Sequence, residues 1–180
     1  MSEADEVLQF WFAETKPASW WKTDPAFDGE IRRRFASLHA RASRGELAAW
    51  RATPAGRLAE VIVLDQFSRN LFRDSAPAFA QDLAALVLAQ AAVAAGTHRA
   101  LDPVQRSFLL MPYMHSESPV IHVEAERLFR EFAPRENHDF ELKHKAIVDR
   151  FGRFPHRNKA LGRVSTPEEI EFLKRPGSSF

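Results

Sequence analysis

The chain has no cysteine among its 180 residues, which excludes disulfide bonds, thiolate catalysis, iron–sulfur clusters and cysteine-ligated zinc. It has almost no net charge either, because 25 basic and 24 acidic residues leave a formal charge of +1. Such a balance gives no overall attraction to nucleic acid or to an acidic membrane. We therefore expect neither as a partner, and any site for an anion must be local.

Long apolar runs and a basic leader are also missing. The longest apolar stretch, residues 83–95, contains Gln90 and falls short of the about 20 residues that a membrane-spanning helix needs. Residues 1–6 are acidic and lack the basic segment that opens a signal peptide. These absences predict a cytoplasmic protein, and they leave its oligomeric state open.

Signals for helix ends are abundant. A capping residue precedes proline at Asp24, Thr53, Asp102, Ser118 and Thr166, and this pair is typical of a helix start. Glycine follows a helical stretch at residues 45, 96, 152 and 177. The apolar period between these marks is helical. It predicts helices at about 3–14, 25–44, 54–73, 77–95, 103–115, 119–133, 138–151 and 167–174.

These patterns predict an all-α fold of about eight helices in one domain, residues 1–180. No strand-like alternation occurs together with hairpin turns, and no Gly/Ser-rich or charged linker divides the chain. Short connections favour antiparallel neighbours, either as stacked antiparallel helix pairs or as an irregular helical bundle. Phenylalanine occurs 15 times against one tyrosine, so large rings are expected to fill the core.

The first polar cluster lies in residues 64–73. Asp65 and Arg69 are four residues apart on one helix face and can form an ion pair, with Asn70 beside them. The flanking faces are apolar, which predicts a central, buried helix. One interpretation is an internal salt bridge that fixes helix packing. The other is a polar wall of a binding site.

The second cluster, residues 111–117, contains Pro112, which should kink or end its helix. His115 and Glu117 would then lie at a helix end. In the structural interpretation, Ser116 or Ser118 caps the next helix, Glu117 favours its dipole and His115 is a hydrogen-bonded structural residue. In the functional interpretation, His115 is a general base or a metal ligand.

The third cluster is a loop, residues 151–163, that carries three arginines, His156 and Asn158. Guanidinium groups match phosphate or carboxylate in a bidentate manner, so Arg153, Arg157 and Arg163 predict an anion site. Phe154 and Leu161 would anchor the loop, and the helix start at Thr166 could add to the site. Alternatively, the loop is solvated and its arginines cap helix ends.

No motif identifies a cofactor. The chain has no Walker loop, no dinucleotide-binding glycine motif and no nucleophile elbow. His115, Glu117, His144 and His156 lack the spacing of a metal site, and His144 and Lys143 are expected to face solvent. We therefore expect no metal and no cofactor.

Taken together, the three clusters resemble a bacterial family known as domain of unknown function 924. The resemblance extends over nearly the whole chain, through residues 7–12, 64–73, 111–117, 151–158, 161–163, 165–169 and Phe180. Two positions differ: Ser68 stands where proline is common, and Ser118-Pro119 replaces an acidic and an apolar residue. The resemblance implies a tetratricopeptide-like fold and no established activity.

Two functions follow as hypotheses. In the first, the clusters form a pocket for a small anionic metabolite that carries a phosphate or carboxylate. Its predicted ligand-binding residues are Asp65, Arg69, Asn70, Arg153, His156, Arg157, Asn158 and Arg163, and its catalytic candidates are His115, Glu117 and His156. In the second, the chain is a tetratricopeptide-like module that binds a peptide along a groove lined by Trp20-Trp21, and the polar clusters are internal struts. Whether the protein is an enzyme stays open.

Overall fold

The computed structural model describes residues 2–180, and within them the chain forms eight α-helices and no strand. This confirms the all-α prediction. The α-helices are α1 (Glu3–Leu8), α2 (Pro25–Ser43), α3 (Pro54–Leu71), α4 (Asp82–Ala94), α5 (Pro103–Met114), α6 (Pro119–Phe132), α7 (Arg135–Phe151) and α8 (Pro167–Leu173). A π-helical turn, Gln9–Glu14, extends α1. Short 3-10 turns occupy Pro17–Trp21, Ala48–Ala52, Ala76–Phe79, Thr97–Ala100 and Pro155–Arg157.

The predicted caps form at four of the five helix starts. The side chains of Asp24, Thr53, Asp102 and Thr166 accept hydrogen bonds from first-turn N–H groups. The exception is Ser118, whose side chain makes no capping bond. Instead, the hydroxyl of Ser116 accepts a hydrogen bond of 3.2 Å from the Ser118 N–H.

Two predicted boundaries were wrong. The helix expected over 77–95 is interrupted at residues 80–81, which separate the 3-10 turn Ala76–Phe79 from α4. The helix expected from residue 138 begins at Arg135, directly after Pro134. Pro134 caps through its backbone carbonyl, which accepts from the N–H groups of Asn137 and His138, so no capping side chain marked this start.

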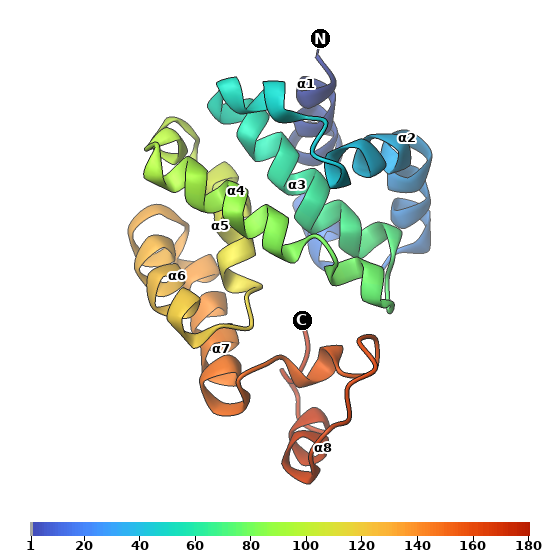
Figure 1. Cartoon of the computed structure of the whole chain (residues 1–180), viewed down its shortest axis with the longest axis vertical. Helices are drawn as coiled ribbons and strands as arrows, with labels where there is room; N and C mark the ends of the chain where they lie inside the picture. Colours follow the sequence, from blue (N-terminus) through green and yellow to red (C-terminus); the bar gives the residue numbers. More distant parts are fainter. Residues whose placement is uncertain (1) are drawn as a thin grey trace.

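Helix α3 lies at the centre of the molecule, as its two apolar faces predicted. Thirteen of its 18 residues are buried. It packs against α1, α2, α4 and α5 (Figure 1). Because water is excluded on all these sides, a polar group on α3 must find its partner within the protein.

Aromatic rings fill the core around α3. Phe67 of α3 stacks on Phe35 of α2 with ring centroids 5.0 Å apart. Trp11 meets Phe67 edge-on at 5.7 Å and Phe108 of α5 at 5.6 Å. Each such pair contributes roughly 0.5–1.5 kcal/mol beyond the burial of its area. These contacts confirm the predicted ring-rich core.

By length and composition alone, Ala76–Ala94 is long and apolar enough to cross a membrane. Its mean hydropathy is 1.4, and 28% of the window is buried. The interruption at residues 80–81 leaves α4 as a continuous helix of 13 residues. That is shorter than the about 20 residues that a span needs.

The last part of the chain, residues 152–180, is here called the C-terminal segment. Figure 1 shows it below α3, α4 and α5, with the end of the chain between α8 and these helices. Phe154 anchors it as predicted: the side chain is fully buried against Ile147 and Val148 of α7. Burial of such a ring stabilises the fold by about 1.5–3 kcal/mol. Leu161, the second expected anchor, is half-buried.

Candidate functional site

A cavity of about 500 Å³ opens between α3, α5, α7 and the C-terminal segment. This volume is typical of small-molecule sites, which span about 300–1,000 Å³. Part of the wall is aromatic and comprises Trp20, Trp21, Phe79, Phe140 and Phe180. The polar wall includes Lys22, Arg69, Asn70, Arg73, His115, His156 and Arg157.

Asp65 and His115 form a pair beside the cavity. Asp65 is fully buried on α3, and its Oδ1 accepts a hydrogen bond of 2.8 Å from Nδ1 of His115. Burial opposes a charged carboxylate, but the charge of Arg69 and the hydrogen bond from His115 outweigh it, so the pKa of Asp65 is lowered. An ionised carboxylate can only accept hydrogen bonds. The proton between the two groups is therefore on Nδ1 of His115.

The second nitrogen of His115 is available to a ligand. His115 lines the cavity, and within residues 2–180 its Nε2 makes no hydrogen bond and is not sealed from solvent. Burial lowers the pKa of His115. The ring is therefore neutral near pH 7, with its proton on Nδ1. Nε2 is then an unprotonated base directed away from Asp65.

Two arginines share one carboxylate at the cavity wall. Arg69 binds Asp82 in a bidentate manner, with nitrogen–oxygen distances of 3.0 and 3.1 Å. Arg157 donates to the same carboxylate at 3.1 Å and to the His115 carbonyl at 3.0 Å. Arg69 also pairs with Asp65 at 3.3 Å, which confirms the pair predicted from their spacing. The arrangement joins α3, α4, the end of α5 and the C-terminal segment.

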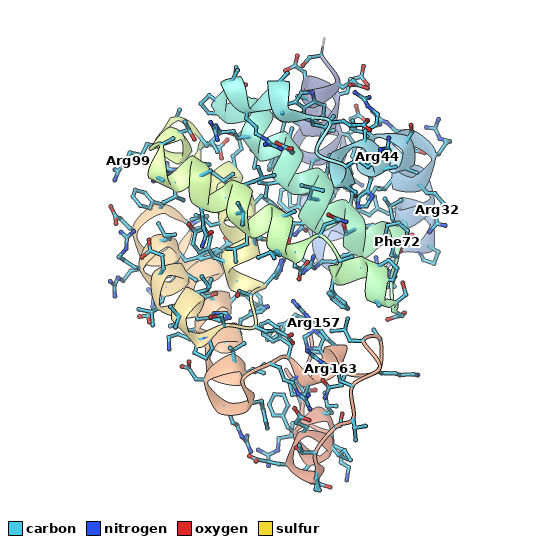
Figure 2. The ribbon with its side chains drawn as sticks, viewed as in Figure 1. Arg32, Arg44, Phe72, Arg99, Arg157 and Arg163 are labelled. Carbon is cyan, nitrogen blue, oxygen red and sulfur yellow. The ribbon has the colours of Figure 1, made fainter. Side chains whose placement is uncertain are left out.

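Arg157 is held tightly for a charged side chain. It is only 5% exposed, and its guanidinium lies 4.6 Å from the ring centres of both Phe79 and Phe154. Burial and the neighbouring Arg69 lower its pKa to about 10. It therefore remains protonated at neutral pH. Within the described residues its Nε has no hydrogen-bond partner. Figure 2 shows Arg157 in the space between the C-terminal segment and the helices above it.

Two further histidines line the cavity. His156 was predicted here, and burial lowers its pKa to about 4. His144 was expected to face solvent, which was wrong: it is 6% exposed, and burial lowers its pKa to about 3. Its Nδ1 donates to the carbonyl of Phe140, one turn earlier on α7. Since α7 packs against α5 and α6, the helix face that carries His144 is turned inward.

Other predicted site residues hold the C-terminal segment instead. Glu117 was expected to favour a helix dipole or act in catalysis. In the structure its carboxylate accepts from Arg163 at 2.7 and 2.8 Å and from the Phe154 N–H at 2.7 Å. Burial opposes the charge, but the bonds from Arg163 and Phe154 lower the pKa of Glu117. Figure 2 shows Arg163 on the C-terminal segment.

Glu169 gathers three more of the predicted groups. Its carboxylate binds Arg153 through two hydrogen bonds of 2.7 and 2.8 Å and accepts from Asn158 at 3.2 Å. It also accepts from the Thr166 N–H as part of a capping box. The start of α8 is therefore closed by a carboxylate and is not available for an external anion, which corrects that expectation.

Asn70 lines the cavity, but its amide donates to Asp28 of α2 at 2.8 Å. The same carboxylate binds Arg73 in a bidentate manner. Sequence reasoning missed Asp82, Arg73, Lys22 and Phe180 as neighbours of the site. Asp82 carried a weak signal, because an acidic residue in a first helical turn is explained by the helix dipole alone. Within residues 2–180, no group of three or more histidine or acidic residues is arranged to hold a metal.

Comparison with known proteins places the chain in a family. A family model described as a bacterial protein of unknown function, DUF924, matches residues 7–177. The chain belongs to the DUF924 family. A solved structure of ATU0120, a protein of unknown function from Agrobacterium tumefaciens, is similar in sequence and fold to this DUF924 chain. The identity is 36% and the TM-score 0.90, over 95% of this chain and 96% of that one. No curated protein matches the chain.

Proposed function

We propose that the cavity binds a small anionic molecule that carries a phosphate or a carboxylate. The observation that supports this most is the shared carboxylate of Asp82. It holds Arg69 and Arg157 side by side, and both guanidinium groups line the cavity. Asp65 is a second counter-ion of Arg69, so what the pair offers a ligand is two adjacent guanidinium groups, whose N–H donors match a phosphate or a carboxylate.

The distribution of charge on the wall agrees with an anionic ligand. Among residues 2–180, four basic side chains line the cavity, and Asp74 is the only acidic residue in its lining. The carboxylates that neutralise the arginines, those of Asp28, Asp65 and Asp82, lie behind the wall. They fix the arginines in position before a ligand arrives, which reduces the entropy lost on binding.

A second candidate function is general-base catalysis on the bound molecule. Nε2 of His115 is unprotonated near pH 7, and Asp65 fixes the ring through Nδ1. A histidine oriented by a carboxylate is a common proton acceptor in enzymes. In this proposal His115 takes a proton from the ligand or from a water beside it. Asp65 stabilises the imidazolium that results.

The alternative of a peptide-binding module with internal struts has less support. Glu117 and Glu169 do act as struts, since they bind Arg163 and Arg153. Arg69, His115, His156 and Arg157, in contrast, converge on one open cavity. If the polar clusters served only to hold the helices together, their side chains would not need to line one shared cavity.

Thermal unfolding with inorganic phosphate, phenyl phosphate and acetate tests the proposal. A ligand that binds only the folded state raises Tm, and one at a hundred times its Kd adds about 2.7 kcal/mol. We expect a rise in Tm with at least one of these anions. Arg157→Lys should abolish it, because lysine keeps the charge but cannot span Asp82 and the ligand.

The matched control is Arg150→Lys. Arg150 also pairs with a glutamate, Glu168, but it is exposed and does not line the cavity. This variant should respond to the anions as the native protein does. An increase in Tm that persists in folded Arg157→Lys would contradict the proposed site. Catalysis is tested separately with His115→Gln and an ester of the bound anion, such as phenyl phosphate. If the native protein hydrolyses this ester and the variant binds it without hydrolysis, His115 acts in catalysis and not in binding.

A further inference from the structure

The side chain of Phe180 lines the cavity. It stacks on the imidazole of His144, with ring centres 3.7 Å apart and planes inclined by 20°. Its other neighbour is His156, which it meets edge-on at 6.1 Å. Phe180 is still 51% exposed. One face of the ring is therefore covered by His144, and much of the remainder is open to the cavity and to solvent.

The imidazole of His144, on which this ring stacks, is held in place by its own contacts. Its Nδ1 is bound to the Phe140 carbonyl, and its edge packs at 5.7 Å against Phe154, which is fully buried. The imidazole is 6% exposed. A neutral ring that is fixed by these two contacts offers a flat, apolar face, which suits another planar ring.

Phe180 itself is loosely held. The last anchored residue before it is Ser178, which is 6% exposed and whose hydroxyl donates to the Leu173 carbonyl. Within the described part of the chain, Ser179 and Phe180 make no hydrogen bond to other residues. The stack on His144 and the loose attachment together make the ring of Phe180 removable.

We propose that Phe180 occupies the slot of an aromatic ring in the ligand, and that the ligand is an aryl phosphate or aryl carboxylate that displaces it. This inference rests on the proposed function, because the anionic group would bind at Arg69 and Arg157. The ring centres of His144 and His115 are 6.3 Å apart. A ring stacked on His144 therefore places its substituent beside His115 and the arginines.

Calorimetric titration with two matched anions tests this. Phenyl phosphate and inorganic phosphate share the anionic group and differ in the ring. We expect phenyl phosphate to bind more tightly to the native protein. In Phe180→Ala its affinity should rise about three- to tenfold, the loss of one competing aromatic stack. The affinity for inorganic phosphate should stay unchanged.

Two variants serve as controls. Val164→Ala removes an exposed apolar side chain from the same segment, outside the cavity, and should change neither affinity. Phe180→Leu keeps apolar bulk without a ring and should give an intermediate affinity for phenyl phosphate. Circular dichroism before each titration checks that the variants are folded, which the exposure of Phe180 favours.

Each contrary outcome has a distinct meaning. Two results would overturn the displacement of Phe180 and leave the anion site standing. One is equal affinity of the native protein for both phosphates, and the other is unchanged or weaker binding of phenyl phosphate to Phe180→Ala. If neither phosphate binds any of the folded variants, including Phe180→Ala, the proposed function itself fails.

Discussion

At the scale of single residues, the cavity depends on groups whose ionisation is set by their neighbours. Asp65 is buried yet charged, because Arg69 and His115 compensate for the water it has lost. His144 and His156 are neutral for the opposite reason, since burial penalises the imidazolium. The wall of the cavity thus carries fixed positive charges and neutral imidazoles, and buried negative charges lie behind it.

Stability should fall when the solution is acidified below pH 6.5. The pKa of His144 is lowered to about 3 and that of His156 to about 4, whereas the ordinary value is 6.5. Below pH 6.5 the unfolded chain binds protons that the folded chain does not, so the free energy of unfolding decreases as pH falls. Each histidine contributes on the order of 1 kcal/mol per pH unit. Urea denaturation at pH 7.0, 6.0 and 5.5 measures this slope.

The variant His144→Phe isolates the contribution of His144 from those of the other histidines whose pKa is lowered, which are His39, His98, His115 and His156. It keeps a ring beneath Phe180 but removes a group that titrates, so its free energy of unfolding should depend less on pH over this range. The absolute stability at pH 7.0 is not the readout, because the bond to the Phe140 carbonyl is also lost. A variant with the same slope as the native protein would show that His144 is not the source.

At the scale of helices, caps and close approaches fix where each element begins. Thr53 caps α3 through the Gly56 N–H at 3.0 Å. The preceding 3-10 turn, Ala48–Ala52, crosses this first turn so closely that only glycine fits at residue 56. An added Cβ would lie 2.0 Å from the carbonyl oxygen of Trp50. The first turn of α3 therefore packs directly against the backbone of Trp50, which cannot move as easily as a side chain.

Gly56→Ala should destabilise the protein by about 1–3 kcal/mol, since the backbone must move to accommodate the methyl group. The control is Gly29→Ala on the exposed side of α2, where an added Cβ meets nothing within 4 Å. There alanine should raise stability by about 0.5–1 kcal/mol, through its better helix propensity. Denaturant unfolding of both variants measures the two changes, and effects of the same sign would refute this account.

At the scale of the whole molecule, the cavity exists only because the C-terminal segment is fastened to the helices. Glu117, between α5 and α6, binds Arg163 and the Phe154 N–H of that segment. Arg157 makes a second attachment through Asp82 of α4. Loss of either attachment should loosen one wall of the cavity while α1–α5 keep their own core.

Glu117→Gln should cost about 1–3 kcal/mol of stability, because it leaves the partly buried Arg163 without its counter-ion. Amide exchange should accelerate most in residues 152–165, and anion binding should weaken. Glu168→Gln is the matched control, because Glu168 pairs with Arg150 at the surface and should matter by less than about 1 kcal/mol. Uniform acceleration of exchange over the whole chain would argue against a local attachment.

The sequence by itself determined the features that depend on neighbours along the chain. Four caps, the central α3 and the Asp65–Arg69 pair follow from spacings of at most four residues, over which helix geometry is fixed in advance. Only the tertiary structure decided which distant groups share a carboxylate. Asp65 meets His115 across 50 positions, and Asp82 meets Arg157 across 75. Glu117 and Glu169 took Arg163 and Arg153 away from the predicted site. Helix packing sets these distances, and a charge pairs with whichever opposite charge that packing brings near.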